Sequence, residues 1–228
     1  MANAIIRTSA AVLGAIAVSA AAAGEAGGEL PPGYEEGLPI LRLQKDAARD
    51  RGWLLVRDGV LVFDLKTRRT IARISLPEWQ WADETYICPP DLVLGPKGEA
   101  LVSSNVVPTL WRVDPVSLAV TRHALVLDAH DDKDVGFTGL AFSAAHGSFY
   151  AVSHFGALWR IDLVLTRAQK VDLSAPITGA CGVATRRRKG TFNRFFGLCV
   201  RGDQGGGWTV NLAPDRRSGY VMARPCTP

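Results

Sequence analysis

The stretch Leu110-Trp111-Arg112-Val113-Asp114 recurs in related form along the chain and decides the fold. Its counterparts are Leu61-Val62-Phe63-Asp64-Leu65, Leu158-Trp159-Arg160-Ile161-Asp162 and Gly207-Trp208-Thr209-Val210-Asn211. The acid or amide of each copy stands at position 64, 114, 162 or 211, so successive copies are 50, 48 and 49 residues apart. A regular period of roughly 20–50 residues is typical of repeat architectures.

Each copy lies among four short apolar runs. In the second copy these runs cover residues 91–94, 100–103, 110–113 and 118–127, with a Gly95-Pro96-Lys97-Gly98 turn after the first. The third and fourth copies repeat this order, whereas the first copy must take its opening strand from residues 40–43. The runs are short, rich in Val, Ile and Trp, and without helical periodicity, so each copy is predicted to be a four-stranded antiparallel unit.

Four-stranded units of this length are typical of a β-propeller, in which each sheet is one blade around a central axis. The "LWRVDP"-like third strands resemble those of quinoprotein-like propeller repeats, although no specific family motif is present. The resemblance implies an all-β domain over residues 38–228, with blades at about 40–76, 90–127, 138–174 and 180–226. A closed four-bladed ring is the simplest form, and a five-bladed ring or an eight-bladed ring of two chains are alternatives. Closure is expected through pairing of the strands near Ile40 and Tyr220, because a ring closed in this way has no free sheet edge.

The recurring residues of the third strand have structural explanations. We expect Phe63, Trp111, Trp159 and Trp208 to pack each blade against its neighbour, since large aromatic side chains dominate cores. The recurring Asp or Asn is expected to cap the following turn through bonds to its own backbone.

The N-terminus has the features of an export signal. An apolar run of small residues at 10–23 follows Arg7, and Ala21-Ala22-Ala23 offers a cleavage pattern. We therefore expect a signal peptide at 1–24, a flexible leader at 25–37, and a periplasmic or secreted protein without a membrane span. The net charge of +4 falls to +3 without Arg7, and the basic run at 186–189 indicates a solvated loop rather than a nucleic-acid site.

Four cysteines in an exported chain indicate disulfides, with three possible pairings. Cys181 opens one predicted strand and Cys199 closes the next, which favours their pairing. Cys88 would then pair with Cys226.

Candidate ligand-binding residues lie in loops at one end of the predicted blades. Arg57, Asn105, His154 and Arg201 stand 7, 9, 8 and 10 residues before the acid or amide of their repeat. Such matching positions could converge near the axis. The connection after the first blade, residues 77–88, is unusually long and aromatic; its candidates for ligand contact are Trp79, Trp81, Asp83, Glu84 and Tyr86.

The second connection is acidic. It offers Asp128, His130, Asp131, Asp132 and Asp134 within seven residues as candidate ligands for a hard divalent cation such as Ca²⁺. The pattern departs from the helix-loop-helix calcium motif, so a solvated acidic loop is the simpler interpretation.

No catalytic motif is visible in the sequence. The favoured function is an exported binding or scaffold protein that holds a partner protein or small ligand on its inter-blade loops. A metal-dependent propeller hydrolase, lactonase or lyase is the alternative, and a quinoprotein-like redox accessory is a further one. A homodimer is compatible with each of these functions.

Overall fold

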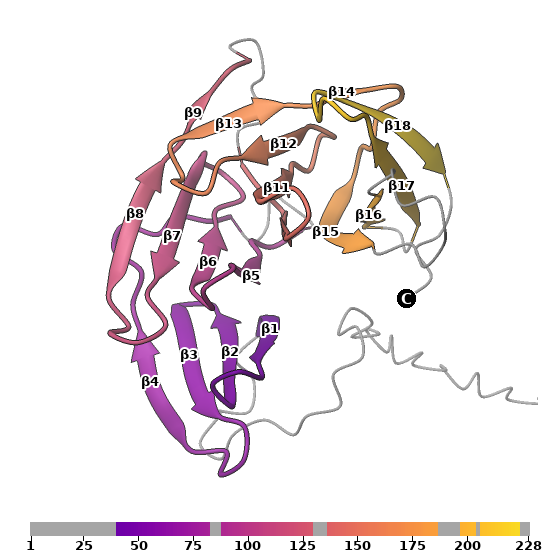
Figure 1. Cartoon of the computed structure of the whole chain (residues 1–228). Coiled ribbons are helices and arrows are strands. Elements are labelled where there is room, and N and C mark those ends of the chain that lie inside the picture. The colour runs from indigo at the N-terminus through magenta and orange to yellow at the C-terminus, as the bar shows by residue number, and fades with distance from the viewer. Residues whose placement is uncertain (1–39, 83–87, 130–135, 187–196, 204–205, 224–228) are drawn as a thin grey trace, which may run out of the picture.

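The computed structural model describes residues 40–82, 88–129, 136–186, 197–203 and 206–223. Within these ranges the chain is built from strands, which form four sheets that follow one another along an arc (Figure 1). The predicted all-β propeller architecture is confirmed. None of the described segments is a helix long and apolar enough to cross a membrane.

Blades 1 and 2 are antiparallel meanders of four strands. Blade 1 consists of β1 (Ile40–Asp46), β2 (Arg51–Val56), β3 (Gly59–Asp64) and β4 (Thr70–Ile74), paired in chain order. Blade 2 consists of β5 (Leu92–Leu94), β6 (Ala100–Ser103), β7 (Thr109–Val113) and β8 (Val120–Ala124). Tight turns between successive strands make this order possible.

Blades 3 and 4 each gain a fifth strand. Blade 3 contains β10 (Gly139–Ser143), β11 (Ser148–Val152), β12 (Leu158–Ile161) and β13 (Arg167–Lys170), with β9 (Val126–Leu127) parallel to β13. Blade 4 contains β15 (Ala180–Arg186), β16 (Gly197–Gly202), β17 (Gly207–Leu212) and β18 (Ser218–Ala223), with β14 (Asp172–Leu173) parallel to β18. The added strands come from the chain that leaves the preceding blade, and they cover an outer edge that would otherwise be unpaired.

The expected closure between the first and last strands is wrong. β18 is paired with β17 and β14, whereas β1 is the edge strand of blade 1 and pairs with β2. β14 takes the place beside β18 at Ser218 and Gly219, and β1 does not pair with β18.

The first strand of each blade faces the centre of the arc. β1 lies against β5, β5 against β10, and β10 against β15, while β4, β8, β13 and β18 lie on the outside (Figure 1). In an antiparallel meander, the loops after the second strand and the connections between blades share one end, which we call the connection end. The turns between third and fourth strands lie at the opposite end, the turn end.

The recurring tryptophans pack between blades as predicted. Trp111 is fully buried in a cluster with Trp53, Val62 and Leu92 from blades 1 and 2. Trp159 is fully buried in a second cluster, with Leu101 of blade 2 and other residues of blade 3. Trp208 is partly buried and packs against the cluster shared by blades 3 and 4. Phe63 differs from this pattern, because it lies in a separate cluster of blade 1. Three of the four aromatics therefore pack between blades as predicted.

The recurring acids cap turns, also as predicted. The Asp114 Oδ1 accepts hydrogen bonds from the backbone N–H groups of Val116 (2.9 Å) and Ser117 (2.8 Å). Asp64 does the same for Lys66 and Thr67, and Asp162 for Thr166. These bonds hold the pKa of Asp64 and of Asp114 below the usual value, mainly because backbone N–H groups stabilise the charged carboxylate.

The predicted disulfide pairing is wrong. Cys88 is bonded to Cys181, with the two Cα atoms 5.0 Å apart. Cys199 stands opposite Ala184 in the β15–β16 register, three residues along the strand from Cys181. That offset corresponds to roughly 10 Å, which is beyond the reach of a disulfide. Cys199 is also disulfide-bonded, and Cys226 lies outside the described residues.

The Cys88–Cys181 bond joins parts of the chain that are 93 residues apart. Cys88 belongs to the connection between blades 1 and 2, and Cys181 to the innermost strand of blade 4. The bond therefore links two blades that are not neighbours in sequence, at the centre of the connection end.

Candidate functional site

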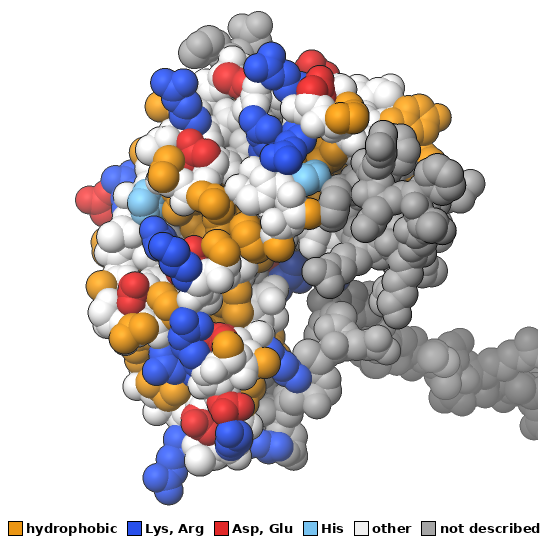
Figure 2. Space-filling model, in the orientation of Figure 1, with side chains coloured by type: hydrophobic (Ala, Val, Ile, Leu, Met, Phe, Trp, Pro, Cys, Tyr) orange, Lys and Arg blue, Asp and Glu red, His pale blue; other side chains and the backbone are white. Residues whose placement is uncertain are grey.

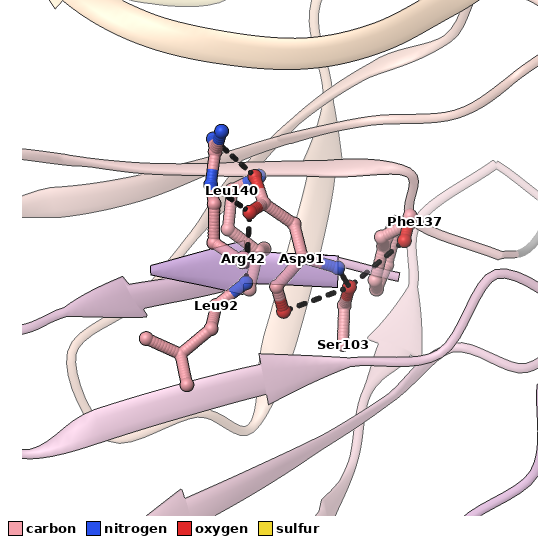
Figure 3. Close-up of polar contacts among 6 residues, drawn as sticks. All are labelled: Arg42, Asp91, Leu92, Ser103, Phe137 and Leu140. Atoms are coloured by element: carbon pink, nitrogen blue, oxygen red, sulfur yellow. Dashed lines mark hydrogen bonds and ion pairs between the residues drawn. The ribbon is translucent and has the colours of Figure 1, made fainter. Parts of the chain in front are cut away.

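A carboxylate at the start of β5 joins three blades at the axis (Figure 3). Asp91 accepts a hydrogen bond from the Arg42 Nη2 of β1 (3.0 Å), from its neighbour Leu92 N (2.8 Å), and from Leu140 N of β10 (2.8 Å). The Arg42 Nε lies 2.5 Å from the Asp91 Oδ1 as an ion pair, although its N–H is not aimed for a hydrogen bond. The Asp91 side chain is only 5% exposed, so this is a largely desolvated charge with several partners.

The backbone of Asp91 is held as firmly as its side chain. The Ser103 Oγ of β6 accepts from Asp91 N (2.8 Å) and donates to the carbonyl of Phe137 (2.9 Å), which precedes blade 3. Ser103 is fully buried. Buried polar groups that are hydrogen-bonded to several strands favour one arrangement of those strands. We call Arg42, Asp91, Ser103 and Leu140 the axial hub.

The axis is narrow beside the hub because two glycines meet there. A Cβ on Gly139 of β10 would lie 2.6 Å from the Cα of Gly182 in β15, so the two backbones are in contact. A Cβ on Gly182 would in turn lie 3.2 Å from the Arg201 Nη2. The guanidinium of Arg201 therefore lies directly over Gly182, next to the hub.

Hydrogen bonds from the loop after β6 hold the connection between blades 1 and 2 in place. The Asn105 side chain donates to the carbonyls of Ala82 (2.7 Å) and Cys88 (3.2 Å) and accepts from Ala82 N (2.9 Å). The Ser104 Oγ donates to the carbonyl of Gln80. Asn105 is 2% exposed. Its amide thus shapes the connection, and its predicted contact with a ligand stays a prediction.

The two tryptophans of the connection form an aromatic pair. Their ring centroids are 5.9 Å apart, and both rings are partly exposed. The Trp79 Nε1 donates to the carbonyl of Ser103 (2.9 Å), and the Trp81 Nε1 to the carbonyl of Arg57 (3.2 Å). The Arg57 guanidinium lies 5.9 Å from the centre of a Trp81 ring, within the range of a cation–π contact. We call Arg57, Trp79 and Trp81 the aromatic surface.

His154, in the loop after β11, lies against the disulfide. Its Nδ1 is 3.4 Å from the Cys88 Sγ, and its carbonyl accepts from Gly179 N (2.7 Å). The exposed ring of Phe155 stands edge-on to the imidazole at 5.4 Å between centroids. His154 therefore lies at the connection end, near the centre of the arc.

The structure brings together part of the predicted set. Asn105 and His154 both contact Cys88, one at its carbonyl and the other at its sulfur. Arg201 of blade 4 lies over Gly182, whose backbone contacts Gly139, whereas Arg57 lies on Trp81. Asn105 and His154 thus lie together at Cys88, and the role of the four matched residues in ligand binding stays a prediction. The other predicted residues of these connections, apart from Asp128, lie outside the described residues: Asp83, Glu84, Tyr86, His130, Asp131, Asp132 and Asp134.

The described residues contain no cluster of three or more His, Cys, Asp or Glu side chains that could hold a metal ion. Asp128, the described acid of the second connection, accepts a hydrogen bond from Lys170 N of blade 3 (2.7 Å). The predicted cation site depends on residues 130–135 and stays a prediction.

Sequence reasoning missed the axial hub. Arg42 and Asp91 are 49 residues apart, as are Asp91 and Leu140, which is one repeat period. An arginine and an acid at matching positions of successive inner strands were therefore a usable signal. On the visible face, basic and acidic side chains are interspersed (Figure 2), so charge distribution alone does not mark the hub.

Comparisons with known proteins agree on the fold. No protein-family model and no curated protein matches the chain. Among solved structures it is similar to an auxiliary nutrient binding protein from Bacteroides thetaiotaomicron, at 11% identity and a TM-score of 0.54, with 83% of this chain and 43% of that one covered. It is also similar to U3-55K, at 13% identity and 0.53, and to the RRP9 WD40 repeats, at 13% and 0.54.

The chain spans about half the length of these solved structures. The matches to U3-55K and to the RRP9 repeats each include 82% of this chain. They include 52% of U3-55K and 51% of the RRP9 repeats. At such identities the likeness shows a β-propeller fold.

Proposed function

We propose that the protein is an exported binding module that holds a ligand or partner protein at the connection end of the propeller. Propeller folds serve many unrelated functions, so function must be inferred from the residues of the site. The observation that carries it is the rigid presentation of the aromatic surface formed by Arg57, Trp79 and Trp81.

A loop that only had to link two blades would not need this degree of fixation. Carbonyl groups of residues 77–82 accept hydrogen bonds from Trp111 Nε1, Ser104 Oγ and Asn105 Nδ2. In the same segment, Trp79 Nε1 donates to the carbonyl of Ser103, and Ala82 N donates to Asn105 Oδ1. The indoles of Trp79 and Trp81 have their N–H groups satisfied by backbone carbonyls and still keep part of their rings exposed. Rigid aromatic side chains lose little entropy on binding, which is why they are enriched at contact surfaces.

Export is part of the proposal. The signal-like N-terminus and the disulfides support it, because disulfides persist in oxidising compartments. The nutrient binding protein among the structural neighbours is compatible with such a role, although its likeness to this chain concerns the fold.

Site-directed photo-cross-linking tests the proposal. A benzophenone amino acid replaces Gln80, which is exposed between the two tryptophans, and in a matched variant it replaces Val116, which is 78% exposed at the turn end. We expect a discrete adduct from the Gln80 variant after irradiation of the cells that produce the protein, and none from the Val116 variant. Adducts of equal yield from both variants, or no adduct from the Gln80 variant, would contradict the proposal.

A further inference from the structure

Arg201 is a half-buried cation of blade 4. Its side chain lies over Gly182 at the axis and makes no hydrogen bond or ion pair with any described residue. Burial lowers the pKa of its guanidinium, and so does the positive charge of Arg42, while Asp91 partly opposes this effect. The backbone of Gly182 contacts Gly139, whose neighbour Leu140 donates to Asp91, the partner of Arg42, so Arg201 and Arg42 border the same group of inner-strand residues.

Asp91 has little capacity left to compensate Arg201. Its Oδ2 accepts from the Arg42 Nη2 and Leu140 N, and its Oδ1 accepts from Leu92 N and lies against the Arg42 Nε. A carboxylate offers about four acceptor positions, and these four contacts occupy those of Asp91. In contrast, the Arg42 Nη1 has no partner among the described residues, and Figure 3 shows the end of this guanidinium projecting beyond Asp91.

We propose that Arg42 and Arg201 together bind the carboxylate group of a ligand at the centre of the connection end. Two guanidinium groups and one carboxylate leave a net charge of +1 at the hub. A single carboxylate neutralises this charge. Its two oxygens also suit the planar donors of arginine, which bind carboxylates in a bidentate manner.

The site is separate from the aromatic surface and does not depend on it. Asp203 lies in the same loop region, and its Oδ1 is 2.9 Å from the position that a Cβ of Gly179 would take. His154 lies against the disulfide. An anion bound between blades 4 and 1 would also hold these two blades together.

Titration of the arginine Nε–Hε resonances with sodium acetate tests the proposal. Ionic strength is held constant by replacing chloride with acetate, and sulfate is titrated in parallel. We expect saturable shifts of the Arg42 and Arg201 signals with acetate, with weaker effects of sulfate and chloride. A rise in Tm of about 3–6 °C is expected at an acetate concentration ten times its Kd. Arg69, exposed in the turn after β3, should shift only in a linear, non-saturating way.

Two variants complete the experiment. Arg201→Gln should abolish the saturable shift of Arg42 and the rise in Tm, whereas Arg69→Gln should retain both. The proposal is overturned if acetate causes no saturable shift in the wild-type protein, if sulfate saturates the site and acetate does not, or if Arg201→Gln still responds. The wild-type titration decides the question even if a variant folds poorly, and a negative result leaves the cross-linking test of the aromatic surface unaffected.

Discussion

Replacement of Asp91 by Asn should destabilise the protein strongly, because it leaves the Arg42 charge without its partner in a largely buried place. The Arg42 side chain is 22% exposed, so water can recover only a small part of its lost interaction. Removal of one partner from a buried ion pair costs about 3–5 kcal/mol. Partial exposure of Arg42 and the acceptor that Asn retains place the expected loss near the lower limit, at about 3 kcal/mol. For a domain of this size that loss lowers Tm by about 6–12 °C.

Thermal and urea unfolding of four proteins measure this effect: the wild type, Asp91→Asn, Arg42→Met and the double variant. We expect the cost of Asp91→Asn to be smaller by about 1.5 kcal/mol or more when Arg42 is already absent, since contacting residues are not additive. Hydrogen exchange at Leu140, whose N–H bonds to Asp91, should become faster in Asp91→Asn. A Tm within 1 °C of the wild type, or strictly additive changes in the double variant, would refute the role assigned to the hub.

Three other predictions concern different parts of the fold. Cys88→Ala with Cys181→Ala removes a cross-link that spans 93 residues, so unfolding in urea should require about 2–5 kcal/mol less; a loss below 0.5 kcal/mol would contradict a stapling role. Burial, followed by the charges of nearby arginines, lowers the pKa of His146, so the folded state binds fewer protons than the unfolded state just below pH 6.5. Stability should therefore fall as pH falls through this region, and His146→Asn should weaken the fall in Tm between pH 7 and 5.5. The same dependence of Tm on pH in the variant and the wild type would contradict this role of His146. Gly139→Ala places a methyl group against the Gly182 backbone and should lower the free energy of thermal unfolding by about 1–3 kcal/mol. Gly147→Ala is the control: its turn is open, with no atom within 4 Å of the added methyl group, so it adds only the strain of a positive φ.

The sequence period was sufficient for the fold because each repeat performs the same local tasks. Trp111 and Trp159 fill equivalent spaces between blades, and Asp64, Asp114 and Asp162 satisfy equivalent turns. Such residues must recur, since neighbouring blades present them with nearly the same surroundings. The fifth strands of blades 3 and 4 could not be predicted in this way, because they depend on how a connection lies along the next blade.

The axial hub and the disulfide were harder to predict for a different physical reason. Asp91 bonds to Arg42 and Leu140 across two blade boundaries, and its chemistry is visible only when inner strands are compared one period apart. Cys88 and Cys181 meet because a connection and the inner strand of a distant blade come close at the centre of the arc. Pairing of cysteines within a hairpin ignores this geometry.

Ligand-induced stabilisation, compared across variants at the two ends of the propeller, tests most directly whether ligands bind at the connection end. Hits from a library of aromatic and carboxylate-bearing small molecules are measured by thermal shift on the wild type and on Trp81→Ala, Arg201→Gln, Arg69→Gln and Val116→Ala. We expect the rise in Tm to be lost or reduced in Trp81→Ala or Arg201→Gln and to be kept in Arg69→Gln and Val116→Ala. If the ligand-induced rise in Tm disappears only in Arg69→Gln or Val116→Ala, the ligands bind at the turn end, and binding at the connection end is contradicted.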